Sequence, residues 1–259
     1  MSREGGKTTG LCGYDEDNIL IRDKNLVRDL IGKLSFTEMM LFHITGQMPN
    51  ALQLTVTDAV LVTIMEHGLV PSAIAARLTL LGAPESFQGA VAAGLLGVGD
   101  RYAGTAAECG RLLEQIVAAG EAEKEATARA IVRDYRASRR PLPGFGHPVH
   151  RSADPRVPRL LEIAEQAGAK GDHIQAMHLL ERCLQEELGK KLPVNVSAAI
   201  AAVLGEAGLP RKVFRGIVLT ARCAGLVGHL LEEMENPAAD AMWKMVEEGI
   251  TFSPEIEGE

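Results

Sequence analysis

Apolar residues recur with a helical period over most of the chain. Segment 52–66 is apolar nearly all round, through residues such as Leu54 and Val60, which predicts a buried central helix. His67-Gly68 follows at once and supplies a stop signal, so His67 is expected at the carboxyl end of this helix. Alternating strand patterns bounded by turn signals are scarce. The pattern therefore predicts an all-α protein.

Start signals divide the rest of the chain into further helices. Thr105 and Glu108 have capping-box spacing, and Asp154-Pro155 is typical of an N-cap followed by a proline in the first helical position. Asp172 is expected to cap a helix that ends near Leu188. The remaining predicted helices are a short one from Pro71 to Gly82, a glycine- and alanine-rich segment over 86–98, and helices over 122–136, from Asn195 or Ser197 to about Gly205, and over 212–234.

Composition limits the classes of function. The chain has 259 residues, 46% of them hydrophobic, enough for a substantial core in one large domain or in a larger and a smaller one. A net charge of −7 and few aromatic residues argue against nucleic-acid binding, which needs a basic face and stacking platforms. The first ten residues resemble no signal peptide, and no apolar run reaches the ~20 residues that span a bilayer. We therefore expect a cytoplasmic protein without membrane attachment.

The cysteines give no sign of a metal site or of a disulfide framework. Cys12, Cys109, Cys183 and Cys223 are far apart and show no CxxC or Cys/His ligand spacing. We expect them to be buried thiols, and we expect no metal.

One segment concentrates positive charge in this acidic chain. Between Arg139 and Arg159, in the run RRPLPGFGHPVHRSADPRVPR, five arginines and two histidines accompany a single carboxylate. Proline and glycine stiffen such a loop, and arginine binds carboxylate or phosphate through two parallel hydrogen bonds. The segment predicts a pocket for small anions.

Three side chains could carry chemistry, and each has an alternative structural role. His67 at a helix end could donate to an oxygen anion, or it could only cap a terminal carbonyl. His147, between Gly146 and Pro148, could meet a ligand or lie in a solvated turn. Arg222 lies in the apolar context LTARCAGL, so it must find an anion, either a core glutamate or a ligand.

The basic run carries a family resemblance. GFGHPVHRSADPR resembles the GxGHxVxxxxDPR signature of the citrate synthase superfamily. Further motifs follow in the family's order: EHG at 66–68, GVGDRYAG at 97–104, PVNVS at 193–197 and AR-x-AGL-x-x-H-x-x-EE at 221–233. The GDR form of the glycine-rich loop and the short length resemble the citryl-CoA lyase branch, including the C-terminal module of ATP-citrate lyase.

The resemblance implies a helical homodimer with an active site between two domains. The large domain would comprise residues 1–104 and 209–259, and the small domain residues 105–208. By matching position, His67 would bind the keto or hydroxyl oxygen of oxaloacetate or citrate, and His147 would polarise the carbonyl that becomes the alcohol. Arg156 and Arg222 would hold the dicarboxylate. Coenzyme A, as a thioester substrate, would place its phosphates near Arg151 and one of Lys190 or Lys191.

Two positions depart from the family pattern. Tyr102 stands where citrate synthases carry a histidine that bonds the acetyl enol oxygen, and citryl-CoA lyases commonly have phenylalanine there. Ser197 stands where both branches place the aspartate that moves the acetyl methyl proton. A serine hydroxyl is a far weaker base than a carboxylate near neutral pH, and a positioned general base contributes roughly 10²–10⁴-fold in rate.

Two hypotheses follow. The first is a citryl-CoA lyase or citrate synthase-like acyltransferase, in which Tyr102 or a water-linked carboxylate replaces the missing base. A variant of it keeps the pocket and changes the reaction, for instance to thioester hydrolysis. The second is a catalytically silent homologue that binds an acyl-CoA or a carboxylate.

Overall fold

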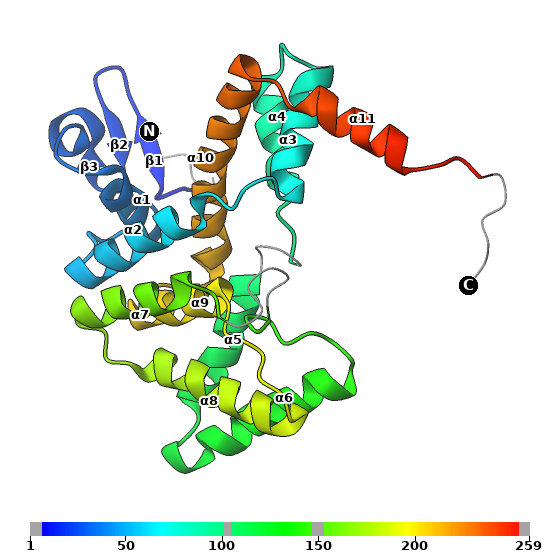
Figure 1. Cartoon of the computed structure of the whole chain (residues 1–259). Helices are drawn as coiled ribbons and strands as arrows, with labels where there is room; N and C mark the ends of the chain where they lie inside the picture. Colours follow the sequence, from blue (N-terminus) through cyan, green and yellow to red (C-terminus); the bar gives the residue numbers. More distant parts are fainter. Residues whose placement is uncertain (1–6, 101–104, 147–152, 254–259) are drawn as a thin grey trace.

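Helices make up most of the described residues, 7–100, 105–146 and 153–253, of this computed structural model (Figure 1). This confirms the all-α prediction. The α-helices are α1 (Phe36–Thr45), α2 (Ala51–Met65), α3 (Pro71–Gly82), α4 (Phe87–Leu96), α5 (Thr105–Ala118), α6 (Lys124–Ala137), α7 (Arg156–Gln166), α8 (Asp172–Leu188), α9 (Val196–Glu206), α10 (Phe214–Glu235) and α11 (Ala239–Gly249).

Short elements complete the description. A small antiparallel sheet near the N-terminus comprises β1 (Cys12–Tyr14), β2 (Ile19–Ile21) and β3 (Lys24–Asn25), in the order β1-β2-β3. The strands have two or three residues each, too few for the alternating pattern that would have predicted them. Single turns of helix follow or join the longer elements: η1 (Leu26–Leu30), η2 (Glu121–Glu123) and η3 (Arg211–Val213).

Several predicted helix ends match the structure. α2 starts with a capping box between Asn50 and Gln53 and ends at Met65, because Glu66 has an extended backbone. α5 begins at Thr105, as the sequence predicts. The cap of α9 is Asn195, whose side chain accepts a hydrogen bond from the backbone N–H of Ser197. Local capping chemistry thus sets these boundaries.

The predicted cap at Asp172 is wrong. Asp172 is the first helical residue of α8, and the carboxylate that caps this helix comes from Glu206 at the end of α9. It accepts hydrogen bonds from the backbone N–H groups of Gly171, His173 and Ile174, at 2.8, 2.6 and 3.1 Å. A partner so distant in sequence leaves no local signature, so a short-range pattern could not reveal it.

α9 lies beside α7 in the lower group of helices in Figure 1, which comprises α5 to α9. Every residue from Val196 to Leu204 is buried, because α5, α7 and α8 pack around this alanine-rich helix. α2 reaches the same group by packing against α7 and α9. The small side chains of α9 allow its neighbours to approach closely, which makes α9 a fixed base for whatever its first turn presents.

α10 extends from this lower group to the top of the molecule (Figure 1) and packs against α2, α3 and α4. The stretch Arg211–Glu235 is long and apolar enough to cross a membrane by length and composition alone. Core helices of globular proteins meet the same criterion, and α10 buries Arg222 and Glu233 within the protein. We therefore interpret α10 as a core helix.

The cysteines only partly match their prediction. Cys109 and Cys183 are buried, Cys223 is half-buried, and Cys12 is exposed on β1, so the expectation of four buried thiols is wrong for Cys12. All four are free. Burial raises the pKa of Cys109 to about 12, which keeps this residue a neutral thiol.

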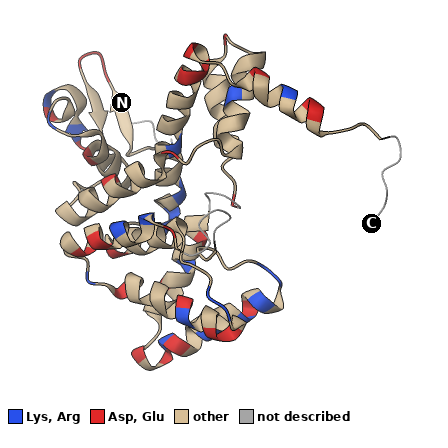
Figure 2. Ribbon diagram, in the orientation of Figure 1, with Lys and Arg blue, Asp and Glu red and all other residues tan. Residues whose placement is uncertain are grey.

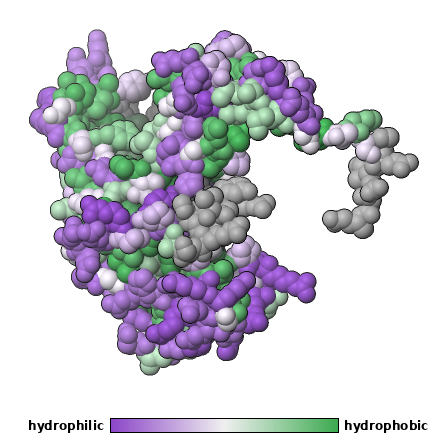
Figure 3. All heavy atoms as spheres, in the orientation of Figure 1, coloured by the Kyte–Doolittle hydropathy of each residue, from purple (hydrophilic) through white to green (hydrophobic). Residues whose placement is uncertain are grey.

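The outer faces of α6 and α8 are charged (Figure 2) and hydrophilic (Figure 3). Arg129 of α6 lies 2.5 Å from Glu186, and Arg133 lies 2.9 Å from Glu187, both on α8. These pairs are largely solvated and contribute little, about 0–1 kcal/mol each.

Candidate functional site

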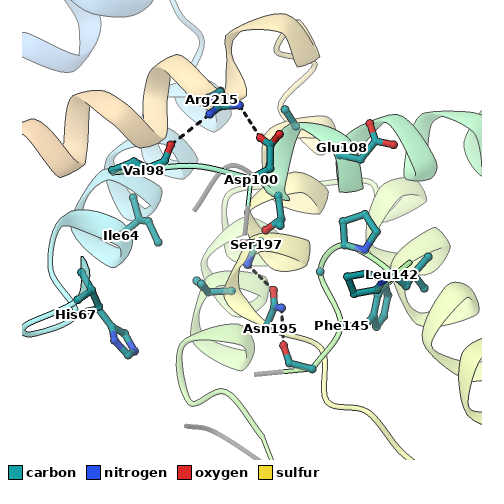
Figure 4. A pocket seen from close by; sticks show the side chains of 18 of the residues that line it. Ile64, His67, Val98, Asp100, Glu108, Leu142, Phe145, Asn195, Ser197 and Arg215 are labelled. Atoms are coloured by element: carbon teal, nitrogen blue, oxygen red, sulfur yellow. Dashed lines mark hydrogen bonds and ion pairs between the residues drawn. The ribbon is translucent and has the colours of Figure 1, made fainter. Parts of the chain in front are cut away.

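A cavity of about 1090 Å³ lies where the end of α2 and the lower half of α10 meet the first turns of α7 and α9 (Figure 4). Four of the residues singled out from the sequence line it: His67, Arg156, Ser197 and Arg222. They come from four separate segments of the chain. The fold therefore brings together side chains that the sequence places up to 155 positions apart, counted from His67 to Arg222 (222 − 67).

The other predicted site residues lie elsewhere. Lys190 and Lys191 are exposed beyond the end of α8, and neither is among the described residues that line the cavity. Tyr102, His147 and Arg151 lie outside the described residues. Their roles stay predictions.

His67 is held by its own neighbour. The Oε1 atom of Glu66 accepts hydrogen bonds from the backbone N–H groups of His67 and Gly68, both at 2.7 Å. Gly68 has a φ of +74°, which favours glycine and turns the chain sharply after α2. This turn places His67 on the cavity wall opposite Leu142 and Phe145 (Figure 4).

The glycine-rich segment before His147 is paired with the chain that leads into α9. Gly146 donates to the carbonyl of Pro193 at 2.8 Å, and Asn195 donates to the carbonyl of Gly144 at 2.9 Å. Gly144 has a φ of +92°, and a Cβ there would lie 2.7 Å from the Cβ of Ala198. Only glycine permits this contact, so the residue type fixes the segment against the start of α9.

Ser197 lies in the first turn of α9, buried at 7% exposure. Its backbone N–H donates to Oδ1 of Asn195 at 2.9 Å, and the Nδ2 group of Asn195 donates to the carbonyl of Gly146 at 2.7 Å. Figure 4 shows Ser197 and Asn195 side by side in the cavity. A hydroxyl therefore occupies a helix N-terminus that would favour a negative charge.

Arg156 is ion-paired within the protein. Its Nε and Nη2 atoms donate to the two oxygens of Asp154 at 2.9 and 2.8 Å, and Asp154 also accepts from the backbone N–H of Val196 at 2.9 Å. The Asp154 side chain is fully buried, and burial acts to raise the pKa of its carboxyl. The hydrogen bonds and charge of Arg156 outweigh this effect, so the pKa lies below its ordinary value. Asp154 thus joins α7 to α9 and orients Arg156.

The sequence left open whether the anionic partner of Arg222 is a core glutamate or a ligand. Its nearest carboxylate is that of Glu66, with Nη1 to Oε1 at 3.6 Å, too long for a hydrogen bond. This Nη1 atom is buried and makes no hydrogen bond to the described residues. Burial lowers the pKa of Arg222, Glu66 opposes this effect, and the charge of Arg156 lowers the pKa further. Glu66 is therefore near Arg222, but the buried Nη1 donor of Arg222 has no hydrogen-bond acceptor among the described residues.

Three more arginines line the cavity: Arg140, Arg211 and Arg215. Each is ion-paired within the chain, to Asp134 at 3.0 Å, to Glu114 at 2.9 Å and to Asp100 at 2.6 Å respectively. Figure 4 shows the pair of Arg215 and Asp100 at the upper edge of the cavity.

The motifs of the sequence did not indicate Arg211 and Arg215 as cavity residues, although a signal was present. Residues 211, 215 and 222 follow one another at helical spacings of four and seven positions, from η3 into the largely apolar first half of α10. Figure 2 shows basic residues on the lower part of α10, where it enters the group of helices α5 to α9.

Positive charge outweighs negative charge in the cavity lining. Five arginines and His67 face two carboxylates, Asp100 and Glu108, among the described lining residues. The Arg111 guanidinium lowers the pKa of Glu108 against an opposing effect of burial, and Tyr135 donates to Glu108 at 2.9 Å. Both carboxylates are thus paired within the protein, Asp100 with Arg215 and Glu108 with Arg111. The arrangement can bind a small molecule with more than one negative charge.

Comparison with known proteins agrees with this description. The family profile described as "Citrate synthase, C-terminal domain" matches residues 18–244. A citrate synthase of Synechocystis sp. (strain ATCC 27184 / PCC 6803 / Kazusa) is 28% identical over 221 residues, which cover 83% of this chain and 54% of that protein. The chain thus spans about half the length of the curated relatives it matches.

Two solved structures share the fold. The citryl-CoA lyase of Hydrogenobacter thermophilus superposes with a TM-score of 0.83 and 29% identity, over 98% of this chain and 96% of that one. The ATP citrate lyase of Methanothrix soehngenii, solved with citrate and coenzyme A, gives a TM-score of 0.76 at 18% identity. It covers 99% of this chain and 43% of its own.

Proposed function

This chain belongs to the citrate synthase family, and on that premise we propose that it makes or breaks a carbon–carbon bond between an acetyl-CoA-type thioester and oxaloacetate, or a related 2-oxo acid. The reaction would be that of a citryl-CoA lyase or of a citrate synthase-like acyltransferase. Similarity to the citryl-CoA lyase of Hydrogenobacter thermophilus over nearly the whole of both chains favours the lyase.

The observation that carries the proposal is the buried, unmet donor of Arg222 in a cation-rich cavity. Nη1 of Arg222 makes no hydrogen bond to the described residues, and the charge of Arg156 acts on it. An unsatisfied buried donor costs about 1–3 kcal/mol, more when it is charged, and a ligand carboxylate would relieve this cost. Two neighbouring guanidinium groups suit a dicarboxylate such as oxaloacetate or the corresponding part of citrate.

The chemistry follows from this placement. In cleavage, the citryl hydroxyl loses its proton as the bond between the carbinol carbon and the acetyl methylene breaks, and the electron pair passes into the thioester as an enolate. That carbon then takes up a proton to give acetyl-CoA. His67 would meet the oxygen that becomes the keto group, and His147 would polarise the same carbonyl.

Proton transfer at the methyl carbon lacks its usual base, because Ser197 stands where the family has an aspartate. Asp100 and Glu108 are the carboxylates among the described lining residues, and both are ion-paired. We propose that Tyr102, or a carboxylate acting through water, moves this proton. Coenzyme A would place its phosphates near Arg151 and Lys190 or Lys191, and the reaction needs no metal.

Substrate consumption tests the proposal. The purified protein is incubated with citryl-CoA, and separately with acetyl-CoA plus oxaloacetate, while free thiol and thioesters are followed by mass spectrometry. We expect turnover of citryl-CoA. If neither mixture changes while an authentic citryl-CoA lyase consumes the first and a citrate synthase the second, the proposed reaction is wrong.

Ser197 favours a second candidate, a silent homologue that binds an acyl-CoA or a carboxylate. The cavity keeps its cations while the described lining holds no unengaged carboxylate. Calorimetric titration distinguishes the two functions. Tight binding of coenzyme A or citrate without any turnover would favour the silent binder.

We also propose that the protein is a homodimer. A groove on the outer face of α10 is lined by Phe36, Leu95, Leu219, Thr220, Cys223, Ala224 and Val227. Next to it, Leu96 is 87% exposed and Leu231 is 55% exposed, and Figure 3 shows apolar surface beside α4. Such a contiguous patch is typical of an interface between subunits. Analytical ultracentrifugation tests it, and a monomer at micromolar concentration would contradict it.

Domain division and location are further parts of the proposal. Residues 1–104 and 209–259 would form the large domain and residues 105–208 the small one, with the cavity between them. This division would let the small domain close over bound substrate. Small-angle scattering with and without citrate tests closure, and cell fractionation tests the proposed cytoplasmic location.

A further inference from the structure

Three polar residues and a glycine form a stripe along one face of α10, from the cavity to the top of the molecule. Arg222, Gly225, His229 and Glu233 are spaced by three or four positions, which aligns them on one side of a helix. The family resemblance assigns a role to Arg222 alone. The other three face the end of α2 and the buried side of α3.

At its upper end, the stripe contacts Arg77 of α3, which is 1% exposed. Its Nη1 atom donates to Glu233 at 2.8 Å, and its Nη2 atom is paired with Glu232. Its Nε and Nη2 atoms also lie 3.2 and 3.0 Å from Nδ1 of His229. Arg77 is therefore a fixed cation whose guanidinium faces the His229 ring.

These contacts determine the tautomer of His229. A guanidinium carries only donors, so Nδ1 of His229 must be the acceptor and carries no proton. The ring is then neutral, with its proton on Nε2. Nε2 lies 3.0 Å from Oε2 of Glu66, whose other oxygen accepts hydrogen bonds from the His67 and Gly68 amides. The Nε2–H group is buried and is not aligned for a hydrogen bond to any described residue, so Glu66 is close to it without being an aligned acceptor.

Both oxygens of Glu66 lie close to other groups of the protein. Oε1 accepts from the backbone of His67 and Gly68 and lies 3.6 Å from Nη1 of Arg222, while Oε2 faces His229. The Glu66 side chain is 45% exposed, so without His229 it would gain rotamer freedom. Any movement of its carboxylate would act on the backbone of His67 and on the charge beside Arg222.

We propose that His229 is a positioning residue, whose buried Nε2–H takes the nearby Glu66 carboxylate as its acceptor and so fixes His67 and Arg222 in the cavity. The inference rests on the proposed function for its kinetic consequence, but not for its structural one. A shift of about 1 Å in a reacting group can cost up to roughly 100-fold in rate, so a loosened Glu66 should lower kcat.

Two amide substitutions distinguish the roles of Nδ1 and Nε2 of His229. In His229→Asn, the side-chain oxygen can replace Nδ1 as the acceptor for Arg77, but the side chain is too short to reach Glu66. In His229→Gln, the longer side chain can carry its NH₂ group to the position of Nε2. Arg77 keeps Glu232 and Glu233 as partners in both variants.

Steady-state kinetics on the full chain gives the first readout. We expect His229→Asn to lower kcat for citryl-CoA by about 10- to 100-fold, with a smaller change in KM, and His229→Gln to restore most of this loss. Equal losses in the two variants would overturn the proposal, because a role in packing alone does not distinguish the nitrogens.

Amide NMR gives a second readout that needs no activity. Hydrogen bonds of 2.7 Å to a carboxylate shift the amide protons of His67 and Gly68 downfield, and His229→Asn should move both signals upfield while His229→Gln should not. If the signals follow this pattern but citryl-CoA is not consumed, the positioning role holds and the proposed reaction fails. Unchanged signals in His229→Asn would overturn the positioning role.

If His229→Asn does not fold, Glu66→Gln supplies the same test. Its oxygen can still accept from the two amides, whereas its NH₂ group would meet Nε2–H of His229, donor against donor. We expect the same loss of kcat and the same movement of the His67 amide signal. A Glu66→Gln variant with wild-type kinetics and spectra would contradict the proposal.

Discussion

Gly225 of α10 lies against Met65, the last residue of α2, so closely that a Cβ atom on Gly225 would overlap the Met65 carbonyl oxygen. The same Cβ would lie 3.2 Å from Oε2 of Glu66. This approach of two backbones brings Glu66 within reach of Arg222 and His229. A glycine inside a helix costs about 0.5–1 kcal/mol relative to alanine, and here the close packing requires it.

We therefore expect Gly225→Ala to destabilise the protein by about 1–3 kcal/mol, since the added methyl group must push α10 away from α2. Urea denaturation at neutral pH measures the loss. Gly228→Ala is the matched control, because a Cβ at Gly228 meets nothing within 4 Å. It should stabilise the protein by roughly 0.5–1 kcal/mol. Equal effects of the two substitutions would show that the approach of α10 to α2 is not tight.

Asp154 offers a second test, because its buried carboxylate joins α7, α9 and Arg156. Asp154→Asn keeps the shape but replaces an acceptor by a donor that faces the guanidinium. Breaking a buried pair costs about 3–5 kcal/mol, and we expect a loss near the lower end because Arg156 retains 18% exposure. Glu162→Gln, in the exposed pair with Arg159, should cost under about 1 kcal/mol. A loss that small for Asp154→Asn would contradict its structural role.

The lowered pKa of Asp154 also makes the free energy of unfolding depend on pH. The folded pKa of Asp154 lies below the unfolded value of about 3.9, so its stabilising contribution is complete above that value. It is lost progressively as the pH falls from about 4 through the lower, folded pKa. We expect the difference in unfolding free energy between wild type and Asp154→Asn to be constant from pH 5 to 7 and to shrink below pH 4. A difference that is independent of pH down to pH 2 would contradict this assignment.

Substitution of Arg222 is expected to weaken ligand binding. Removal of a hydrogen bond to a charged group costs about 1.5–3 kcal/mol, so Arg222→Gln should weaken binding of citrate or oxaloacetate by roughly 10- to 100-fold. Isothermal titration calorimetry measures the change. Lys212→Gln removes one positive charge from an exposed position near the start of α10, outside the described cavity lining, and should leave the affinity within a factor of about two. A similar loss in both variants would indicate a general effect of charge.

The local pattern of apolar residues predicts the helical fold, and the family resemblance of the motifs implies that His67, Arg156, Ser197 and Arg222 share one site. Neither the local pattern nor the resemblance gives the contacts that hold these residues in place, because the partners are distant in the chain. The cap of α8 comes from Glu206, and the partner of Arg222 comes from Glu66. Glu66 stands in the EHG motif, but only the approach of α10 at Gly225 gives its carboxylate a function.

Ser197 provides the last prediction. The first turn of α9 gives a positive potential and already holds Asn195 as its cap, so a carboxylate at position 197 would be favoured there. We expect Ser197→Asp to raise the rate of citryl-CoA cleavage by about 10²–10⁴-fold, the contribution of a positioned general base. Ser197→Asn has the same size without basicity and should give no increase. If Ser197→Asp instead lowers the wild-type activity as much as Ser197→Asn does, the serine hydroxyl itself takes part in the reaction, and the cavity serves a chemistry that does not use an aspartate base.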